Sequence, residues 1–204
     1  MNNRRIETRF NVKYASRNPF VILMNKLLFM KIAYLANICK AKNVLDVGCG
    51  EGVVTRYLVD SCPGIKTVVG VDLGLDRLKI AEGMNYTIKY FQGSIYNLPF
   101  IDDSFDLVLS TEVLEHLEDP SKAISELRRV SKEYIIISVP YDFFFRLANI
   151  LRLKYISNLG NPPRHIQHWN KRSFKHFISQ GLDIFKISIP LLWLIFLCKV
   201  KKVR

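Results

Sequence analysis

Residues 44–52, VLDVGCGEG, constrain the fold of this chain more than any other stretch. An apolar run ends at Asp46, glycines alternate at Gly48, Gly50 and Gly52, and apolar residues then follow at helical spacing. This order predicts a buried strand, a tight turn and the start of a helix. Glycine lets the backbone adopt positive φ and approach a ligand closely, and the free N–H groups of a helix start point into such a turn. The turn is therefore a candidate ligand-binding loop.

A second acid follows at the end of the next predicted strand. Residues 66–71, KTVVGV, are rich in β-branched residues and lead directly into Asp72. A carboxylate in this place can accept two hydrogen bonds from a ribose diol, and Asp72 lies about as far from Gly48 as the roughly 20 residues of a nucleotide site predict. The G-x-G-x-x-G spacing of dinucleotide-binding folds would place its third glycine at Val53. The pattern therefore predicts a ribose-containing cofactor and disfavours a nicotinamide dinucleotide.

Strand-like and helix-like stretches alternate along the middle of the chain. Strands are predicted over residues 87–91, 105–110 and 134–139, and helices over 53–61, 75–83 and 120–130. Asp119 and Pro120 are a typical N-cap and first residue for the last of these helices. Alternation of this kind is typical of an α/β fold with a doubly wound, parallel sheet. The length of 204 residues predicts one domain.

Two stretches resemble a known family. The spacing D-x-G-x-G-x-G of residues 46–52 resembles the first motif of the class I S-adenosylmethionine-dependent methyltransferases. Residues 93–110, GSIYNLPFIDDSFDLVLS, resemble the third region of that family, with Ser94 in place of its usual acid. The resemblance covers residues 43–198 and is strongest to the quinone-pathway O-methyltransferases. It implies a Rossmann-like, mostly parallel, seven-stranded sheet with an antiparallel last strand, in which residues 182–188 and the following apolar run are the final strands.

The resemblance also implies the cofactor, S-adenosylmethionine, and the residues that bind it. From the methionine end of the cofactor to its adenine, these are Asp46, Gly48, Cys49, Gly50, Ser110, Asp72, Leu73, Ser94 and Ile95. The first four would line the methionine end, Ser110 the sulfonium side and Asp72 the ribose. The last three would contact adenine, with the hydroxyl of Ser94 accepting the bond that an acid accepts in the family.

The stretch TEVLEHLEDP places candidate catalytic residues after the fourth strand. Glu112, Glu115 and His116 stand at i, i+3 and i+4, so on a helix they would share one face at the carboxyl end of a central strand, where open α/β sheets bind ligands. Three interpretations stay open: solvated acids on a surface helix, His116 as a general base, or a divalent metal site. The E-x-x-E-H spacing resembles that of small-RNA 3′-terminal 2′-O-methyltransferases and quinone-pathway O-methyltransferases, where these residues bind magnesium. Mg²⁺ is therefore an open alternative, and no metal ligand is assigned.

The predicted domain divides into four parts. These are an N-terminal helical cap (1–42), a cofactor-binding half (43–140), a substrate cap (141–170) and a C-terminal helix with strands (171–204). The substrate cap is aromatic and basic, and in the family an insertion here covers the substrate pocket. Its His165 and His168 are expected to complete a metal site, to touch the substrate or, like Trp169, to pack the cap.

Missing motifs narrow the chemistry. Amino-methylating enzymes of the family carry an Asn- or Asp-Pro-Pro-aromatic motif after strand four, where this chain reads Ser110-Thr111-Glu112. Base-C5 methylation needs a cysteine nucleophile near the ends of strands four or five, and Cys39, Cys49, Cys62 and Cys198 lie elsewhere. Direct displacement on the sulfonium methyl by an oxygen, nitrogen or carbon nucleophile remains.

Charge is spread unevenly. The net charge of +12 divides into +8 for residues 1–43, −6 for 44–140 and +10 for 141–204. If the basic ends cover the mouth of the site, the substrate or docking surface is anionic. The alternative is an ordinary, solvated, lysine-rich surface.

Two apolar stretches and the cysteines bear on location. Residues 20–38 are apolar but interrupted by Lys26 and Lys31, which favours an amphipathic helix packed through Leu23, Leu27, Met30 and Tyr34 over a transmembrane span. The apolar run near the C-terminus is too short to span a membrane, although its basic tail is compatible with peripheral contact. The cysteines form no C-x-x-C pair, which is typical of a reducing compartment. A cytoplasmic protein, with peripheral membrane contact as an option, is expected.

These observations favour S-adenosylmethionine-dependent methylation, by preference on oxygen, of a small or lipid-linked anionic acceptor. A nucleotide-dependent dehydrogenase is a rival within the same fold class. The alternative from another class is a non-catalytic, methyltransferase-like module that binds RNA or a partner through its basic ends.

Overall fold

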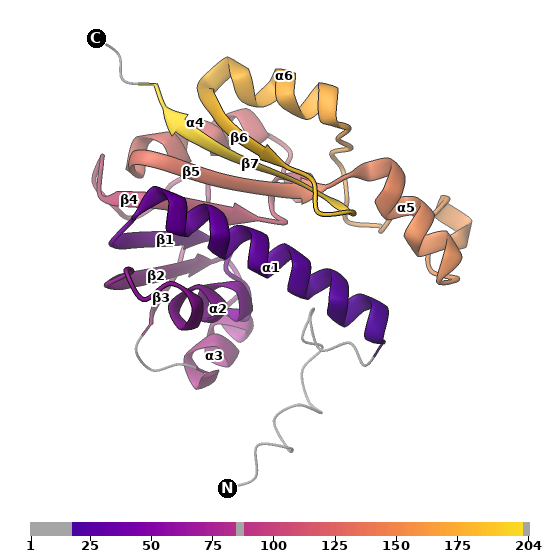
Figure 1. The fold of residues 1–204 in the computed structure, drawn as a ribbon, viewed down its shortest axis with the longest axis horizontal. Coiled ribbons are helices and arrows are strands. Elements are labelled where there is room, and N and C mark those ends of the chain that lie inside the picture. Colours follow the sequence, from indigo (N-terminus) through magenta and orange to yellow (C-terminus); the bar gives the residue numbers. More distant parts are fainter. Residues whose placement is uncertain (1–17, 85–87, 202–204) are drawn as a thin grey trace, which may run out of the picture.

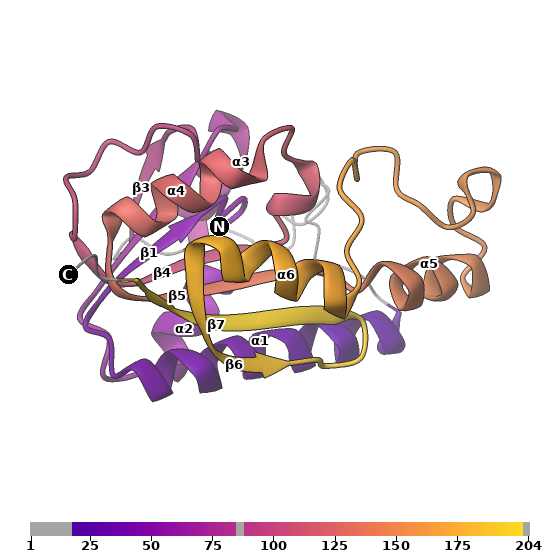
Figure 2. The same ribbon diagram turned by 90° about the horizontal axis from the view of Figure 1, so that it is seen from above.

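The computed structural model describes residues 18–84 and 88–201, which form a seven-stranded sheet covered by helices on both faces (Figures 1 and 2). The strands are β1 (Asn43–Val47), β2 (Thr67–Asp72), β3 (Lys89–Gln92), β4 (Phe105–Thr111), β5 (Ser131–Pro140), β6 (Leu182–Ser188) and β7 (Trp193–Val200). Their order is β3-β2-β1-β4-β5-β7-β6, and β7 runs antiparallel to both of its neighbours. The predicted doubly wound, mostly parallel sheet with an antiparallel last strand is confirmed. Thr87, at the start of the predicted third strand, lies outside the described residues.

The sheet is buried on both sides because helices pack on each face. On one face α4 (Pro120–Val130) and α6 (Lys171–Gly181) share a core with alternate strand residues such as Leu45 and Val108. On the other, α1 (Pro19–Cys39) and α2 (Val53–Ser61) pack against Leu107 and its neighbours. The continuous apolar strands that the sequence shows are therefore required by burial on two faces. Helix α3 (Leu75–Met84) contacts β2 and β3 near the edge of the sheet.

Helix α1 exists as predicted, but of the four residues predicted to pack on the domain only Leu27 lies against the core. Leu23, Met30 and Tyr34 are about half exposed. The residues buried on the sheet are Met24, Leu28, Phe29, Ile32, Ala33, Leu35 and Ala36. The helix is apolar around most of its circumference, so residue spacing alone does not select the face that contacts the sheet.

The same helix bears on the membrane prediction. By length and composition α1 can cross a membrane, because its two lysines do not lower the mean hydropathy enough to exclude it. This is weak support for a span, since core helices pass the same test. In the structure the helix covers one face of the sheet and contacts α2, β5 and β7.

The segment after β5 projects from one end of the molecule. Helix α5 (Asp142–Leu151) and a 3₁₀ turn, η3 (Ile156–Asn158), extend away from the sheet before the chain returns to α6 (Figures 1 and 2). This end of the sheet carries the carboxyl ends of the parallel strands β1 to β5. The division of the domain into four parts stays a prediction.

Candidate active site

The glycine turn lies where the strand order reverses. From β1 the strand order runs outward to β2 and β3 on one side, and the chain then crosses back to add β4 and β5 on the other side. Open α/β sheets bind ligands in the crevice at such a point. The backbone N–H groups of Gly48 and Cys49 donate to the carbonyl of Val71 at 2.7 and 3.0 Å, and that of Gly50 donates to Asp72 Oδ2 at 2.9 Å. The turn is thereby fixed to the end of β2.

The three glycines are needed for different reasons. All have positive φ, at 76°, 56° and 74° for Gly48, Gly50 and Gly52. A Cβ on Gly48 would lie 2.3 Å from a methyl of Val113, and one on Gly52 would lie 2.5 Å from the Tyr90 hydroxyl. At Gly50 the nearest such atom is 4.0 Å away. Gly48 and Gly52 therefore serve close packing, whereas Gly50 borders open space.

Cys49 turns its side chain toward the protein. Its thiol lies so close to Gly70 of β2 that a Cβ there would be 2.9 Å from the sulfur. Burial raises the pKa of this thiol, so it stays protonated. A contact between Cys49 and a cofactor would therefore use its backbone.

Asp46 is a fully buried acid at the end of β1. Its Oδ2 accepts a hydrogen bond of 2.6 Å from the hydroxyl of Thr55 on α2, while Oδ1 has no hydrogen-bond partner among the described residues. The pKa of Asp46 is raised to about 6, because burial and, to a smaller extent, the nearby charge of Asp72 raise it more than the Thr55 hydrogen bond lowers it. A buried carboxylate oxygen without a donor is suited to an ammonium group.

This pKa makes the stability of the fold depend on pH. Between pH 4 and about 6 the folded protein holds a proton on Asp46 that the unfolded chain has released, so unfolding free energy falls as pH rises through this window. In Asp46→Asn the dependence is absent, and the wild type should lose about 1–3 kcal/mol relative to this variant between pH 4 and pH 7. Urea melts at several pH values measure it, with exposed Asp60→Asn as the matched control. Parallel curves for wild type and Asp46→Asn would contradict the assignment.

Asp72, at the end of β2, is held by a network that includes a residue the sequence analysis missed. Oδ1 accepts from the backbone N–H of Gly74 at 2.7 Å and from the guanidinium of Arg77 through Nε at 3.0 Å and Nη2. Oδ2 accepts from Gly50. The Arg77 side chain is half exposed, so only one side of this ion pair is buried. The available signal was an arginine five residues after the acid, in the first turn of α3.

The residues expected to contact adenine are only partly accessible. Leu73 is exposed, but Ile95 is packed in the core. The hydroxyl of Ser94 accepts from the N–H of Tyr96 at 3.2 Å, so it has one remaining lone pair and its own proton for a ligand. A contact at Ile95 would involve backbone.

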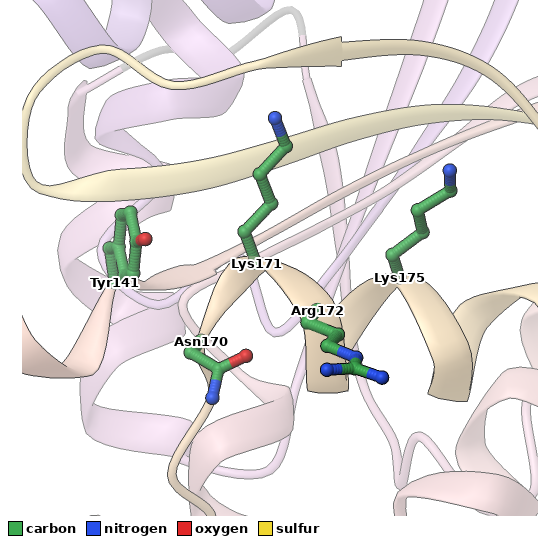
Figure 3. Close-up of a pocket in the computed structure, with 5 residues that line it drawn as sticks. All are labelled: Tyr141, Asn170, Lys171, Arg172 and Lys175. Carbon is green, nitrogen blue, oxygen red and sulfur yellow. The ribbon is translucent and has the colours of Figure 1, made fainter.

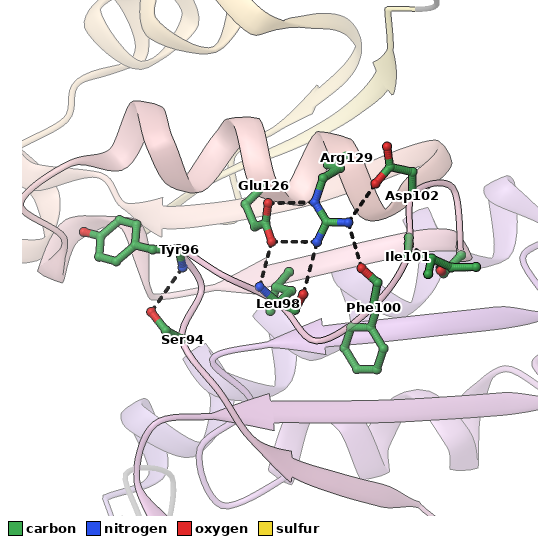
Figure 4. Close-up of polar contacts among 9 residues, drawn as sticks. Ser94, Tyr96, Leu98, Phe100, Ile101, Asp102, Glu126 and Arg129 are labelled. Atoms are coloured by element: carbon green, nitrogen blue, oxygen red, sulfur yellow. Dashed lines mark hydrogen bonds and ion pairs between the residues drawn. The ribbon is translucent and has the colours of Figure 1, made fainter.

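Arg129 of α4 fixes the loop that follows Ser94 (Figure 4). Its guanidinium donates to Glu126 at 2.7 and 2.9 Å, to Asp102 at 2.8 Å, and to the carbonyls of Leu98 and Phe100 at 3.1 and 2.7 Å. Glu126 in turn accepts from the N–H of Leu98 at 2.7 Å. The hydrogen bonds from Arg129 lower the pKa of Glu126. The loop is thus held on α4 by charge-assisted bonds.

The prediction that Glu112, Glu115 and His116 share a helix face is wrong. Glu112 has a φ of 57° and its N–H donates to the carbonyl of Ser138, so it belongs to the end of the sheet. Only one 3₁₀ turn follows, η2 (Leu114–His116). Ser110, at the carboxyl end of β4, is fully buried, and its hydroxyl has no hydrogen-bond partner among the described residues.

The fold instead groups Glu115 with His116 and His165. One potential ligand atom from each lies within 4.8 Å of the others. His116 Nε2 is 3.9 Å from Glu115 Oε1, and its Nδ1 lies 2.8 Å from the carbonyl of Arg164. Because a carbonyl only accepts, Nδ1 carries a proton, and Nε2 faces the Glu115 carboxylate.

The other two singled-out residues hold the cap. His168 Nδ1 contacts Asp142 Oδ1 at 2.9 Å, at the start of α5. The Trp169 ring packs on Phe174 and Phe177 of α6, with centroids 5.4 and 4.9 Å apart. Both positions agree with a packing role for these residues.

A basic pocket of about 390 Å³ lies beside the start of α6 (Figure 3). It is lined by Tyr141, Asn170, Lys171, Arg172 and Lys175. Tyr141 directly follows β5, so the pocket lies near the carboxyl ends of the strands.

All four cysteines fall within the described residues and are free thiols.

Known proteins are similar to this chain in sequence and in fold. The profile of a methyltransferase domain matches residues 45–136. An uncharacterised protein of Methanocaldococcus jannaschii is 30% identical, covering 86% of this chain and 78% of its own. The mitochondrial ubiquinone biosynthesis O-methyltransferase of Dictyostelium discoideum is 31% identical, covering 63% and 44% respectively. The chain thus spans less than half of that curated relative.

A solved structure agrees with these matches. A protein of Bacillus halodurans C-125, described as a methyltransferase, has a TM-score of 0.60 and 25% identity, covering 81% of this chain and 71% of that one. The matched domain, the relatives and the strand order all point to one fold and one cofactor class. The chain belongs to the S-adenosylmethionine-dependent methyltransferases.

Proposed function

We propose that this protein transfers the methyl group of S-adenosylmethionine to an oxygen of a small or lipid-linked anionic acceptor in the cytoplasm. The observation that carries the proposal is the convergence of Asp46, Gly50 and Asp72 at the switch point of the sheet. They offer a buried carboxylate oxygen, open space beside a backbone turn and a second strand-terminal carboxylate. These features fit an ammonium, a close-lying chain and a ribose diol respectively.

When bound, the cofactor supplies a methyl group on a positively charged sulfur. The chain contributes orientation, because aligning donor and acceptor accounts for much of the catalysis in a direct displacement. His116 is the proposed general base. Its ring is oriented by the contact of Nδ1 with the Arg164 carbonyl and lies beside Glu115, so an acceptor hydroxyl would pass its proton to an imidazole that is already held in place. Glu115 and Glu112 are proposed to orient the acceptor and the imidazole.

The acceptor is proposed to be anionic because the C-terminal part of the chain is strongly basic and cations line the pocket that follows β5. Residues 141–204 carry 12 Lys and Arg against two Asp and Glu. Three of these cations line the pocket next to β5. RNA is the less favoured anionic acceptor.

A second candidate makes the same cluster a metal site that positions the acceptor. Glu115, His116 and His165 offer one carboxylate and two imidazoles. Two nitrogen donors suit Mn²⁺, Fe²⁺ or Zn²⁺, whereas Mg²⁺ prefers oxygen ligands. The donor set therefore does not fit the Mg²⁺ that the E-x-x-E-H spacing suggested.

Incubation of the protein with methyl-labelled S-adenosylmethionine and fractionated small-molecule and lipid extracts tests the proposal. We expect label in an anionic product as an acid-stable methyl ether or ester, with loss of transfer in His116→Ala. His165→Ala and chelator treatment distinguish the candidates. If His116 acts as a general base without a metal, methyl transfer should survive both the His165→Ala substitution and the chelator. If a metal is required, each of the two treatments should abolish transfer. Cofactor binding with no labelled product from any extract would favour the non-catalytic binding module.

A further inference from the structure

The tip of the cap, residues 143–159, exposes an unusual amount of apolar surface. Leu151, Leu153 and Leu159 are 76%, 80% and 67% exposed. Other large apolar side chains exposed in this segment are Phe143, Phe144, Leu147, Ile150, Tyr155 and Ile156. The segment projects from the end of the molecule (Figures 1 and 2), so no other described element covers these side chains. Contiguous apolar surface of this kind marks an interaction site.

The tip is arranged with polar groups inside and apolar groups outside. Asn149 is 5% exposed, and its side-chain amide donates to the carbonyl of Gly160 at 2.9 Å. Arg146 Nε donates to the carbonyl of Leu159 at 2.9 Å. Gly160 is so close to the backbone of Arg146 that a Cβ would lie 2.3 Å from its carbonyl oxygen. Polar contacts thus fix the shape of the tip from within while its apolar side chains face outward. In an element exposed to water the apolar side chains are usually inside.

Four backbone N–H groups at the tip also donate within the cap. The N–H groups of Leu153 and Lys154 donate to Ile150 and Asn149 at 2.9 and 2.8 Å. Those of Leu159 and Gly160 donate to Ile156 and Tyr155 at 3.1 and 2.8 Å. An element that enters an apolar medium needs such internal bonds, since it finds no water there.

The charge around the tip is one-sided. Residues 143–182 contain seven Lys and Arg and no Asp or Glu. Arg152 and Lys154 lie in the tip itself, and the pocket of Figure 3 adds Lys171, Arg172 and Lys175 at its base. The adjoining acid, Asp142, is paired with Arg146 and His168. Apolar side chains beside unopposed cations are complementary to an anionic lipid surface.

Neighbouring elements extend the same surface. The N–H of Tyr141 donates to the carbonyl of Leu192 at 2.8 Å, which joins the start of α5 to the turn between β6 and β7. In that turn Leu191 is exposed. The tip follows the carboxyl end of β5, at the edge of the sheet that carries Asp46 and Asp72, so a molecule docked here would turn its site toward the bound surface.

We propose that residues 143–159 dock this protein on an anionic membrane surface, with the leucines of the tip in the interfacial layer and the surrounding cations on lipid headgroups. A second copy of the chain is a poorer occupant, because two such basic surfaces would repel each other. The proposal does not depend on methyl transfer.

Flotation of the full chain with phosphatidylcholine vesicles, with and without phosphatidylglycerol, tests it in the absence of cofactor. We expect binding to the anionic vesicles that weakens as salt is added. Leu151→Ser/Leu153→Ser should lower partitioning at least about tenfold. The matched control is Ile101→Ser, which removes an 83% exposed side chain just before the amino end of β4, at the opposite edge of the sheet.

A charge pair separates the electrostatic part. Lys154→Glu should lower partitioning by about fivefold or more, since each basic residue near an anionic surface contributes about that factor. Exposed Lys66→Glu, before the amino end of β2, should change it much less. Three results would overturn the proposal. These are no flotation at low salt, equal binding to neutral and anionic vesicles, or a leucine variant that dissociates an oligomer of the protein but still binds the anionic vesicles. If S-adenosylmethionine failed to stabilise the protein against thermal unfolding, the proposed function would be wrong but these vesicle results would be unaffected.

Discussion

Asp72→Asn is expected to weaken binding of S-adenosylhomocysteine roughly 100-fold or more. A ribose diol would donate two hydrogen bonds to this carboxylate, and bonds to a charged acceptor contribute about 1.5–3 kcal/mol each. The amide side chain offers one acceptor oxygen and no charge. Asp72 is buried at the end of β2 next to the glycine turn, so water cannot replace the missing bond. Titration calorimetry measures the change.

Two variants control for this effect. Asp76→Asn makes the same chemical change four residues away, on a side chain that is 92% exposed, and should leave affinity unchanged. Arg77→Met removes the guanidinium that pairs with Asp72 and should change affinity less than about tenfold. If Arg77→Met weakens binding as much as Asp72→Asn, the carboxylate acts through its ion pair and the ribose assignment is wrong.

Gly48→Ala is expected to destabilise the fold by about 2–5 kcal/mol. The residue has a φ of 76°, which costs a side chain roughly 1–2 kcal/mol. The new methyl would also lie 2.3 Å from Val113, and overpacking adds about 1–3 kcal/mol. For a chain of this length the melting temperature should fall by about 5–15 °C. Thermal unfolding without ligand is the measurement.

Gly64→Ala is the matched substitution, because a Cβ there meets no atom within 4 Å and φ is not positive. It should change the melting temperature by little. A small effect of Gly48→Ala would show that Val113 moves aside easily, and that Gly48 is needed for the ligand and not for packing.

The sequence predicted the local structure around the candidate site, because this structure depends on chain order alone. The acids at the ends of β1 and β2 and the glycine turn were identified because strand, turn and helix follow each other within 30 residues. The buried stripe of α4 was also predicted correctly, since its apolar residues fall on one face only. Such features need no knowledge of distant contacts.

Other features depend on contacts far apart in the chain. His165 joins Glu115 and His116 across about 50 residues, because the return of the cap to α6 brings it there. The carbonyl of Arg164, which is equally distant in the chain, orients the ring of His116. The stretch after β4 was assigned to a helix by residue spacing, but Glu112 is bonded to β5 and leaves room for a single 3₁₀ turn.

The prediction of which residues of α1 pack on the sheet was largely wrong for a related reason. Its residues are apolar on nearly all sides, so tertiary contacts with β5, β7 and α2 decide which of them are buried. The same ambiguity explains why its composition passes a test for membrane spans. Arg77 was missed because an arginine in a first helical turn has many ordinary roles.

Thermal unfolding of the wild-type protein with S-adenosylmethionine, S-adenosylhomocysteine or NADH, each added alone, tests the central claim most directly. At about 100 times its dissociation constant a ligand adds roughly 2.7 kcal/mol of stability, which shifts the melting temperature measurably. We expect a rise with both adenosyl ligands and none with NADH. No rise with either adenosyl ligand, or an equal rise with NADH, would contradict the assignment of the space beside Gly50 and Asp72 to this cofactor.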